Sequence, residues 1–444
     1  MDRVLIAGTH SGCGKTTVTL ALLMALKAQS VQVSAFKCGP DFIDPMFHRR
    51  AIGVPCYNLD PYFCDEEQLR SLLAAHAGEI SVIEGVMGYY DGVGPEGNYS
   101  TYDVARHTKT PVVLVIDVDG MYASAGAVLH GFLNYKPNSG ICGVVFNGAS
   151  AALYEGLKQI AEQAGITPLG FLPHAADCTL KSRHLGLVTP DEYADMQQKL
   201  LALGKLAQKY IDIAGIRALA ERASEIKERP PQVSPVSRVR IAVARDEAFR
   251  FMYQENVELL EALGTQVVYF SPLCDAALPE NISGLYLCGG YPELYGAALS
   301  SNEAMRRSIR EVIEGGLPTI AECGGFLYLH DTLNGLPMAG VIHASAYNTG
   351  KLTRFGYAEL TAQKHNLLCD AGGTIRAHEF HYYDSGDCGD GFYARKPAGN
   401  RAWACAHASD TLYAGFPHLY FYANPSFAER FIRKAAQYAD SKLH

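Results

Sequence analysis

The sequence predicts an α/β protein of two domains, each with a parallel sheet covered by helices. Short Val, Ile, Leu and Phe runs alternate with helical patterns along the chain, which is typical of strand–helix–strand units. The stretch "RPPQVSPVSR" (229–238) holds three prolines and two serines and precedes a fresh apolar run at Val239. Such a composition is typical of a linker. We therefore expect a first domain over residues 1–229, a linker over 230–238 and a second domain over 239–444.

The composition of the chain argues against several classes of function. Its 444 residues suffice for two or three domains, and its net charge of −8 comes without any basic run, which argues against a nucleic-acid binder. No stretch approaches the roughly 20 apolar residues of a membrane span. The chain enters a strand at once, which leaves no room for a signal peptide, and its twelve cysteines are scattered without a CxxC pair. We expect a cytoplasmic enzyme that binds neither nucleic acid nor membrane.

A glycine-rich turn, "GTHSGCGKTT" (8–17), follows the apolar run "RVLIA" and leads into a helical pattern that begins near Lys15. This order of elements brings free backbone N–H groups and a positive helix end to one point, which makes an anion site. Lys15 can reach the outer phosphates of a nucleotide, and the hydroxyl of Thr16 can ligate Mg²⁺. The alternative is a tight turn whose glycines only relieve backbone strain, but such a turn has little use for Lys15. We expect ATP and Mg²⁺ as cofactors, with these residues at the nucleotide: Gly12, Gly14, Lys15, Thr16 and Thr17.

Acidic residues follow two further apolar runs. Asp41 and Asp44 lie in "KCGPDFIDP", whereas Glu84 ends the run "ISVIE" and Asp91 follows in "GVMGYYDG". Ligands of parallel sheets gather outside the carboxyl ends of strands, and phosphoryl transfer needs a metal held by such acids. We expect Asp41 and Glu84 to join Thr16 at the Mg²⁺. The alternative is that the aspartates only cap turns, which is a weaker explanation for Glu84 because glutamate is a poor turn former.

Two more polar features have two interpretations each. Asn147 ends the apolar run in "GVVFNGAS", where its amide can bond the edge of an adenine, but an ordinary Asn-Gly turn fits the same residues. The segment "KSRHLGL" brings Lys181, Arg183 and His184 together. This cluster suits an anionic substrate, and a solvated basic loop is the other interpretation.

In the second domain, Cys323 stands between an apolar run and a Gly-Gly pair that opens a helical pattern, in "GLPTIAECGGFLYL". This order places a thiol on a sharp strand-to-helix turn at a positive helix end, a setting that lowers a thiol pKa and exposes the sulfur. The flanking glycines argue against a buried structural cysteine. We expect Cys323 to be a nucleophile.

The base for this thiol is expected among the late histidines. His418 follows an apolar run and a Pro turn in "LYAGFPHLYFYANP", and His378 and His381 in "RAHEFHY" are the other candidates. The spacing of the latter two also resembles a metal pair, but a third ligand at suitable spacing is missing. The backbone N–H groups at Gly289 and Gly290 can form an oxyanion hole opposite the thiol.

These motifs resemble those of two known groups of proteins. The loop spacing G-x5-G-K-T resembles the dethiobiotin synthetase branch of P-loop proteins, whose members phosphorylate carboxylates. His10 stands where the neighbouring ParA/MinD branch carries a signature lysine, so a filament-forming or partitioning switch is disfavoured. "GGYPELY", "AECGGFLYL" and "PHLYFYANP" resemble the class I glutamine amidotransferase domain. Tyr420 stands where most class I members carry glutamate, which matches the cobalamin-pathway variant, in which cysteine and histidine suffice.

Over essentially its whole length the sequence is similar to the cobyrinic acid a,c-diamide synthase family. The sister cobyric acid synthases lack "GPDFIDP" and "EGVMGYYDG", which are present here. The resemblance implies a P-loop NTPase-like domain followed by a class I amidotransferase-like domain. It implies ATP- and glutamine-dependent amidation of the a and c acetates of cobyrinic acid through an acyl phosphate, in cobalamin biosynthesis, with ammonia released by Cys323 and His418. The residues expected to steer the substrate are Asp44, Asp91, Arg183 and His184.

The partners implied by this resemblance are L-glutamine and a tetrapyrrole polycarboxylate, with a homodimer as a further option. Hydrogenobyrinic acid and nickel-sirohydrochlorin are alternative substrates that the sequence does not separate. Two other classes remain as alternatives: a regulatory P-loop ATPase with an inactive amidotransferase-like domain, and a cobalt or tetrapyrrole carrier that consumes no ATP. The intact Lys15, Cys323 and His418 argue against both.

Overall fold

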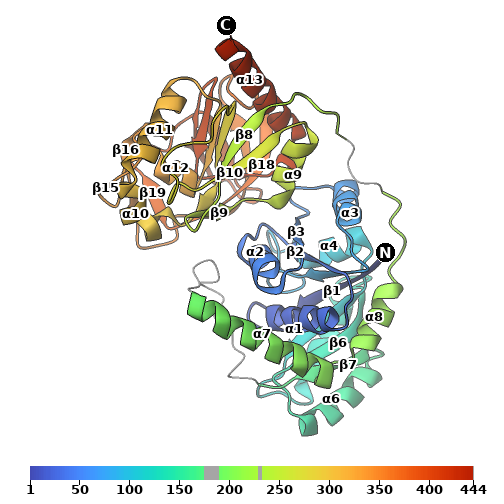
Figure 1. Cartoon of the computed structure of the whole chain (residues 1–444). Helices are drawn as coiled ribbons and strands as arrows, with labels where there is room; N and C mark the ends of the chain where they lie inside the picture. The colour runs from blue at the N-terminus through green and yellow to red at the C-terminus, as the bar shows by residue number, and fades with distance from the viewer. Residues whose placement is uncertain (175–189, 229–232, 444) are drawn as a thin grey trace. The chain divides into compact units, whose positions relative to one another are not determined.

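The computed structural model describes residues 1–174, 190–228 and 233–443. The chain forms two compact units, Met1–Pro231 and Gln232–His444, and each unit has its own sheets and helices (Figure 1). The expected α/β class is therefore confirmed. Within the described ranges, every helix is too short or too polar to span a membrane.

The first unit contains one seven-stranded sheet. Its strands are β1 (Asp2–Gly8), β2 (Val33–Cys38), β3 (Cys56–Leu59), β4 (Ile80–Glu84), β5 (Val112–Asp117), β6 (Ile141–Asn147) and β7 (Thr167–Leu172). They lie in the order β3-β2-β4-β1-β5-β6-β7, and every neighbouring pair is parallel. Successive residues such as Val4 and Leu5 are both fully buried, because helices cover both faces.

The helices of the first unit are α1 (Lys15–Ala28), α2 (Ile43–Phe47), α3 (Glu66–Ala75), α4 (Thr101–Thr108), α5 (Ser124–Asn134), α6 (Ala151–Gln163), α7 (Pro190–Tyr210) and α8 (Ile213–Glu221). Helix α1 packs against α7 and α8, whereas α3 packs against α4 and α5 against α6 (Figure 1). Helices α7 and α8 follow each other closely along the chain. The break between them falls where the Asp212 carboxylate accepts the N–H of Gly215 at 2.8 Å and so caps α8.

The carboxyl ends of β1, β2 and β4 form the edge of the sheet that holds the residues predicted to bind the nucleotide and the metal. The register pairs Glu84 with Ile6 on one side and with Lys37 on the other. Glu84 therefore lies between β1, which continues into the glycine-rich loop, and β2, which continues into the segment of Asp41 and Asp44. This is the convergence that the parallel topology predicts.

The second unit is built on a six-stranded sheet in the order β10-β8-β11-β13-β23-β22. These strands are β8 (Arg240–Ala244), β10 (Gln266–Phe270), β11 (Gly284–Leu287), β13 (Thr319–Glu322), β22 (His407–Ala408) and β23 (Leu412–Gly415). All neighbours are parallel except β22 and β23. The helices of this unit are α9 (Gln254–Ala262), α10 (Gly296–Ser301), α11 (Glu303–Glu314), α12 (Gly324–Tyr328) and α13 (Pro425–Leu443).

The second unit also holds antiparallel sheets, which the expectation of purely parallel sheets missed. The largest has the order β21-β20-β17-β18-β24, and two smaller ones are β15-β14-β16-β19 and β12-β9. Alternate residues Ala358, Leu360 and Ala362 of one strand are buried, as in a sheet with one covered face. The strands are β9 (Phe249–Phe251), β12 (Gly289–Gly290), β14 (His330–Leu333), β15 (Leu336–Pro337), β16 (Ile342–Asn348), β17 (Arg354–Ala362), β18 (Thr374–His381), β19 (Tyr383–Ser385), β20 (Phe392–Arg395), β21 (Ala402–Cys405) and β24 (His418–Leu419).

Candidate active sites

The glycine-rich loop connects β1 to α1, and its glycines are needed for two different reasons. Gly12 and Gly14 have φ of +90° and +95°, a left-handed backbone that residues with a side chain rarely adopt. A Cβ at Gly14 would also collide with the side-chain amide of Asn147. The amide nitrogen of Asn147 donates to the carbonyl oxygen of Cys13 at 3.3 Å, so this residue contacts the loop directly.

A cation and a hydroxyl meet at the amino-terminal end of α1. Lys15 donates from Nζ to the carbonyl oxygen of His10 at 3.0 Å, so its side chain curls back over the loop. Its side chain is buried, and burial lowers the pKa of Lys15. Thr16 donates from its hydroxyl to Oε1 of Glu84 at 2.6 Å, and Thr17 is half-buried beside it.

Glu84 is the centre of a buried charge cluster. Lys37 donates from Nζ to Oε1 of Glu84 at 2.9 Å and is 2.7 Å from Oδ2 of Asp44. His48 places Nε2 3.4 Å from Oε2 of Glu84 and Nδ1 3.3 Å from the Cys56 sulfur. Burial disfavours the charged carboxylate, but Lys37 and His48 outweigh it and hold the pKa of Glu84 well below its ordinary value.

In Lys37 and His48, as in Glu84, neighbouring groups favour the charged form against the effect of burial. Burial disfavours the charged form of Lys37, yet Asp44 and Glu84 raise its pKa. Burial likewise opposes the charge on His48, but Cys56 and Glu84 raise its pKa to about 10. Neither Lys37 nor His48 is among the site residues predicted from the sequence. The sequence pattern can indicate Lys37, because this residue lies near the end of a strand and shortly before two aspartates. No pattern indicates His48, because its position depends on the packing of α2.

The expected metal ligands come together only in part. The oxygens of Thr16 and Glu84 are adjacent, which suits Mg²⁺ because it takes one or two protein oxygens and completes its shell with phosphate and water. Asp41 instead accepts the N–H groups of Ile43 and Asp44 at 2.8 and 3.2 Å and caps α2. Among the described residues, no group of three or more His, Cys, Asp or Glu is arranged to hold a metal by itself.

The remaining first-unit candidates are placed as follows. Asp91 accepts the N–H of Gly88 at 2.8 Å, so it closes a turn, as the alternative interpretation holds, while its side chain stays exposed. Burial and the charge of Asp44 raise the pKa of Asp41 to about 6. Arg183 and His184, together with Lys181, lie outside the described residues.

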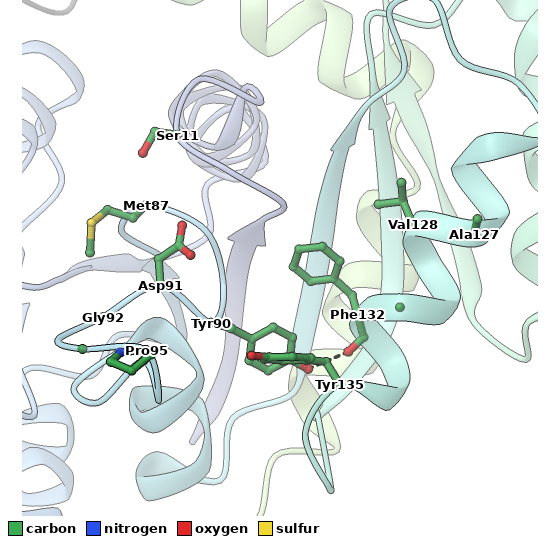
Figure 2. Close-up of a pocket in the computed structure, with 13 residues that line it drawn as sticks. Ser11, Met87, Tyr90, Asp91, Gly92, Pro95, Ala127, Val128, Phe132 and Tyr135 are labelled. Carbon is green, nitrogen blue, oxygen red and sulfur yellow. Dashed lines mark hydrogen bonds between the residues drawn. The ribbon is translucent and has the colours of Figure 1, made fainter.

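A cavity of about 810 Å³ opens beside the glycine-rich loop (Figure 2). Tyr90, Phe132 and Tyr135 form an aromatic side of it. The Tyr90 and Phe132 rings are stacked with centroids 5.6 Å apart, and the Tyr90 hydroxyl donates to the carbonyl oxygen of Phe132 at 2.5 Å. Ser11 of the glycine-rich loop and Asp91 also line the cavity, so the loop and the cavity share one wall. The sequence analysis missed the aromatic side, because it is assembled from α5 and the segment after β4.

In the second unit, Cys323 lies on a strained turn between β13 and α12. Its backbone has φ of +46° and ψ of −99°, which is rare for a residue with a side chain, and its N–H donates to the carbonyl oxygen of Gly415 at 2.8 Å. The sharp strand-to-helix turn is as expected. The expected lowering of the thiol pKa is wrong for this state: burial, Glu293 and Glu379 raise the pKa of Cys323, and α12 is only five residues long.

His418, Gly289 and Gly290 lie near the Cys323 turn. A Cβ at Gly289 would collide with the His418 ring, and a Cβ at Gly324, next to Cys323, would lie 2.7 Å from the backbone nitrogen of Gly290. The Gly289–Gly290 strand therefore lies between the histidine and the start of α12. This arrangement agrees with a general base and backbone donors around one thiol.

The two other histidine candidates lie near His418 but are engaged differently. His378 is the cross-strand partner of His418. Burial is the main cause that lowers the pKa of His378 to about 3, and the charge of His418 is the second. His381 is bonded through Nδ1 to the carbonyl oxygen of Tyr383 at 2.6 Å and faces Glu379 at 3.3 Å. The pair does not form a metal site among the described residues.

A carboxylate that the sequence analysis overlooked faces His418. Oε2 of Glu322 is 3.6 Å from Nδ1 of His418, and Oε1 accepts the N–H of Leu419 at 3.1 Å. Its only sequence signal is the acid directly before the nucleophile in "AECGG". Tyr420, two residues after the histidine, is fully buried and meets the Tyr253 ring edge-on.

Each unit matches a family model. Residues 4–188 match the CobQ/CobB/MinD/ParA nucleotide binding domain, and residues 240–424 match the CobB/CobQ-like glutamine amidotransferase domain. Together, a nucleotide-binding domain and a glutamine amidotransferase domain in one chain define a glutamine-dependent amidoligase.

Full-length relatives narrow this class to one family. The chain is 37% identical to the cobyrinate a,c-diamide synthase of Clostridium acetobutylicum, over 98% of this chain and 100% of that protein. It is 36% identical to that of Caldanaerobacter subterraneus over 98% of each chain, and 37% identical to that of Thermoplasma volcanium over 100% of this chain and 99% of the relative. The chain belongs to the cobyrinate a,c-diamide synthase family.

Proposed function

We propose that this protein uses ATP and glutamine to amidate the a and c acetate carboxylates of cobyrinic acid in cobalamin biosynthesis, through an acyl phosphate. The observation that carries the proposal is that two half-sites occur in one chain, and that the full-length relatives of this chain are named cobyrinate a,c-diamide synthases. One half-site is the phosphate loop with the Thr16–Glu84 contact. The other is the Cys323 turn, with His418 against the neighbouring Gly289–Gly290 strand.

In the first unit, the loop and the amino-terminal end of α1 bind the phosphates of ATP. Lys15 moves from its contact with His10 to the outer phosphates. Thr16 and Glu84 would hold Mg²⁺, which would supply charge neutralisation at the transferring phosphoryl group. Asp41 shapes the segment that carries Asp44 and stays outside direct coordination. Asn147 supports the loop from β6 and lies where an adenine edge can approach.

The aromatic cavity is the proposed seat of the ring substrate. Tyr90, Phe132 and Tyr135 offer flat apolar surfaces to a macrocycle, and the volume of about 810 Å³ is of the size typical of small-molecule sites. Ser11 lies on the wall shared with the phosphate loop, so a peripheral carboxylate of the ring can approach the nucleotide (Figure 2). Asp91 at this wall and Asp44, which is paired with Lys37, steer the substrate or the ammonia.

In the second unit, Cys323 attacks the side-chain amide of glutamine. The thiol proton passes to His418 and then to the departing ammonia, and water hydrolyses the thioester to glutamate. Backbone N–H groups at Gly289 and Gly290 stabilise the oxyanion. The raised pKa of the buried thiol means that the base must take the proton as glutamine binds. Ammonia then displaces phosphate from the acyl phosphate, and a second cycle amidates the other acetate.

The decisive experiment incubates the protein with ATP, Mg²⁺, glutamine and a panel of cobyrinic acid, hydrogenobyrinic acid and nickel-sirohydrochlorin, followed by mass spectrometry. Exchange of two hydroxyls for two amino groups on cobyrinic acid supports the proposal. If the protein amidates one of the other two tetrapyrroles in preference, the proposed substrate changes but the proposed reaction stands. ATP hydrolysis without any glutamine hydrolysis would instead point to the regulatory ATPase.

A further inference from the structure

We propose that Glu322 is the positioning residue of His418, and that it takes the place of the acid that class I amidotransferases usually carry two residues after the histidine. The inference rests on the proposed glutamine hydrolysis by Cys323 and His418. It replaces the expectation that cysteine and histidine suffice with a three-residue arrangement, in which the acid comes from the strand of the nucleophile.

The topology explains why Glu322 reaches the histidine. Strands β13 and β23 are parallel and end together, with Glu322 opposite Gly415. The chain then turns through Phe416 and Pro417, and this turn brings His418 over the end of β13. Oε1 of Glu322 accepts the N–H of Leu419 at 3.1 Å, which holds the backbone just after the histidine. Oε2 is left to face Nδ1 of His418 at 3.6 Å.

The side chains of Glu322 and His418 are both buried, so solvent screens the electrostatic interaction between them only weakly. The side chains of Glu322 and His418 are 2% and 3% exposed. A buried carboxylate costs free energy unless it is paired, and Glu322 is paired with the Leu419 N–H and the His418 ring. Burial first, and then Glu322, raise the pKa of Tyr286 on β11, so the Tyr286 side chain lies close to Glu322.

Within the described part of the chain, three neighbouring side chains are engaged in other ways. Glu379 faces His381 at 3.3 Å rather than His418. Tyr420 occupies the usual position of the acid but is packed edge-on against Tyr253. His378 faces His418 from β18.

The carboxylate selects the tautomer of the imidazole. A proton on Nδ1 is drawn to Oε2 of Glu322, which leaves the lone pair of Nε2 to accept the thiol proton of Cys323. Once that proton has moved, the imidazolium carries a positive charge 3.6 Å from the carboxylate and is stabilised by it. Glu322 touches neither glutamine nor the thiol in this scheme, so it acts through His418.

The test is Glu322→Gln in the full chain, measured by glutamine hydrolysis without any tetrapyrrole. Glutamine keeps an oxygen for the Leu419 N–H, but its NH₂ group donates to Nδ1 and favours the wrong tautomer. We expect kcat to fall on the order of 10²-fold or more, since replacing the orienting acid of a catalytic triad by its amide costs up to about 10⁴-fold. KM should stay within about twofold, since substrate contacts are untouched. A matched control is Glu255→Gln, which changes another fully buried glutamate on α9.

A purely structural role predicts a different pattern. Glu322→Gln would then keep near-normal kcat, because the Leu419 hydrogen bond survives, and only Glu322→Ala would fail. Nitrogen-15 NMR at alkaline pH gives an independent readout, with the His418 signals assigned by their loss in His418→Gln. We expect an Nδ1–H ring in the wild type and an Nε2–H ring in Glu322→Gln. An unchanged tautomer or an unchanged kcat would overturn the inference.

This test separates the inference from the proposed function. Failure to amidate any tetrapyrrole by a wild type that hydrolyses glutamine would remove the proposed substrate and leave Glu322 in place. A wild type that does not hydrolyse glutamine would remove the proposed amidotransferase reaction, and the tautomer measurement would still decide whether Glu322 orients His418.

Discussion

The hydroxyl of Thr16 donates to Oε1 of Glu84 at 2.6 Å, and this contact joins the first turn of α1 to the end of β4. Lys37 donates to the same oxygen at 2.9 Å from the neighbouring strand β2. The carboxylate is thus shared between the phosphate loop and a buried cation. It has a structural function in the first unit and a proposed function at the metal.

Glu84→Gln tests both functions. We expect ammonia-driven synthesis to fall about 10²-fold, because a charge near the transferring phosphoryl group is lost, with partial recovery at high Mg²⁺ or with Mn²⁺. The variant should also lose about 2 kcal/mol of unfolding free energy, since Lys37 and His48 lose a charged partner. Glu79→Gln, an exposed carboxylate paired with Arg217, is the control. Ordinary kinetics at low Mg²⁺ would remove Glu84 from the metal.

Lys15→Ala should separate the two half-reactions in one direction. It removes the cation proposed to face the outer phosphates, a loss expected to cost several kcal/mol of transition-state stabilisation, about 10²-fold or more in rate. Ammonia-driven synthesis should collapse while glutamine hydrolysis survives. Both activities are measured on the same preparation, and efficient diamide formation would contradict the assignment of the loop.

Cys323→Ser should separate the half-reactions in the other direction. Glutamine-dependent synthesis should vanish, because the nucleophile is gone, whereas synthesis from added ammonia should stay within about twofold of the wild type. Cys405→Ser, which changes another buried thiol of the same unit, is the control. Loss of ammonia-driven synthesis in a folded Cys323→Ser protein would argue against separate functions of the two units.

Gly289→Ala tests the packing of the amidotransferase site. A Cβ there would collide with the His418 ring, so the ring must move away from its present position. We expect glutamine hydrolysis to fall at least about 10²-fold, as for a misplaced catalytic group, with ammonia-driven synthesis intact. Gly335→Ala, at a glycine with open space around its Cβ, shows how much an arbitrary glycine matters, although its φ of +80° adds strain. Normal glutamine hydrolysis by Gly289→Ala would show that His418 acts from another position.

His48 makes the stability of the first unit depend on pH. Its pKa is raised to about 10, against about 6.5 for an unperturbed histidine. A raised pKa contributes stability that is complete below about pH 6.5 and is lost as the pH rises through about 10. His48→Gln should therefore cost on the order of 2 kcal/mol near pH 6 and much less above about pH 10. Guanidinium unfolding at both pH values checks this, and an equal cost at both would exclude a charged His48.

The sequence by itself determined the parts of both sites that depend on neighbours along the chain. A strand, a glycine turn and a helix in succession specify the loop around Gly12 and Gly14, because only glycine adopts that backbone freely. The same local logic places Cys323 on a sharp turn between a strand and a helix. The parallel pattern also predicts that Glu84 ends beside the loop, since strand ends share one edge.

Tertiary structure alone decided which distant groups meet and how burial changes them. Lys37 and His48 surround Glu84 because β2, α2 and β4 pack together, and Glu322 faces His418 because β13 and β23 end side by side. The thiol pKa of Cys323 rises rather than falls, since burial outweighs the field of a helix of five residues. Electrostatic energies depend on distances through space and on exclusion of water, and neither quantity is written in the spacing of residues along a chain.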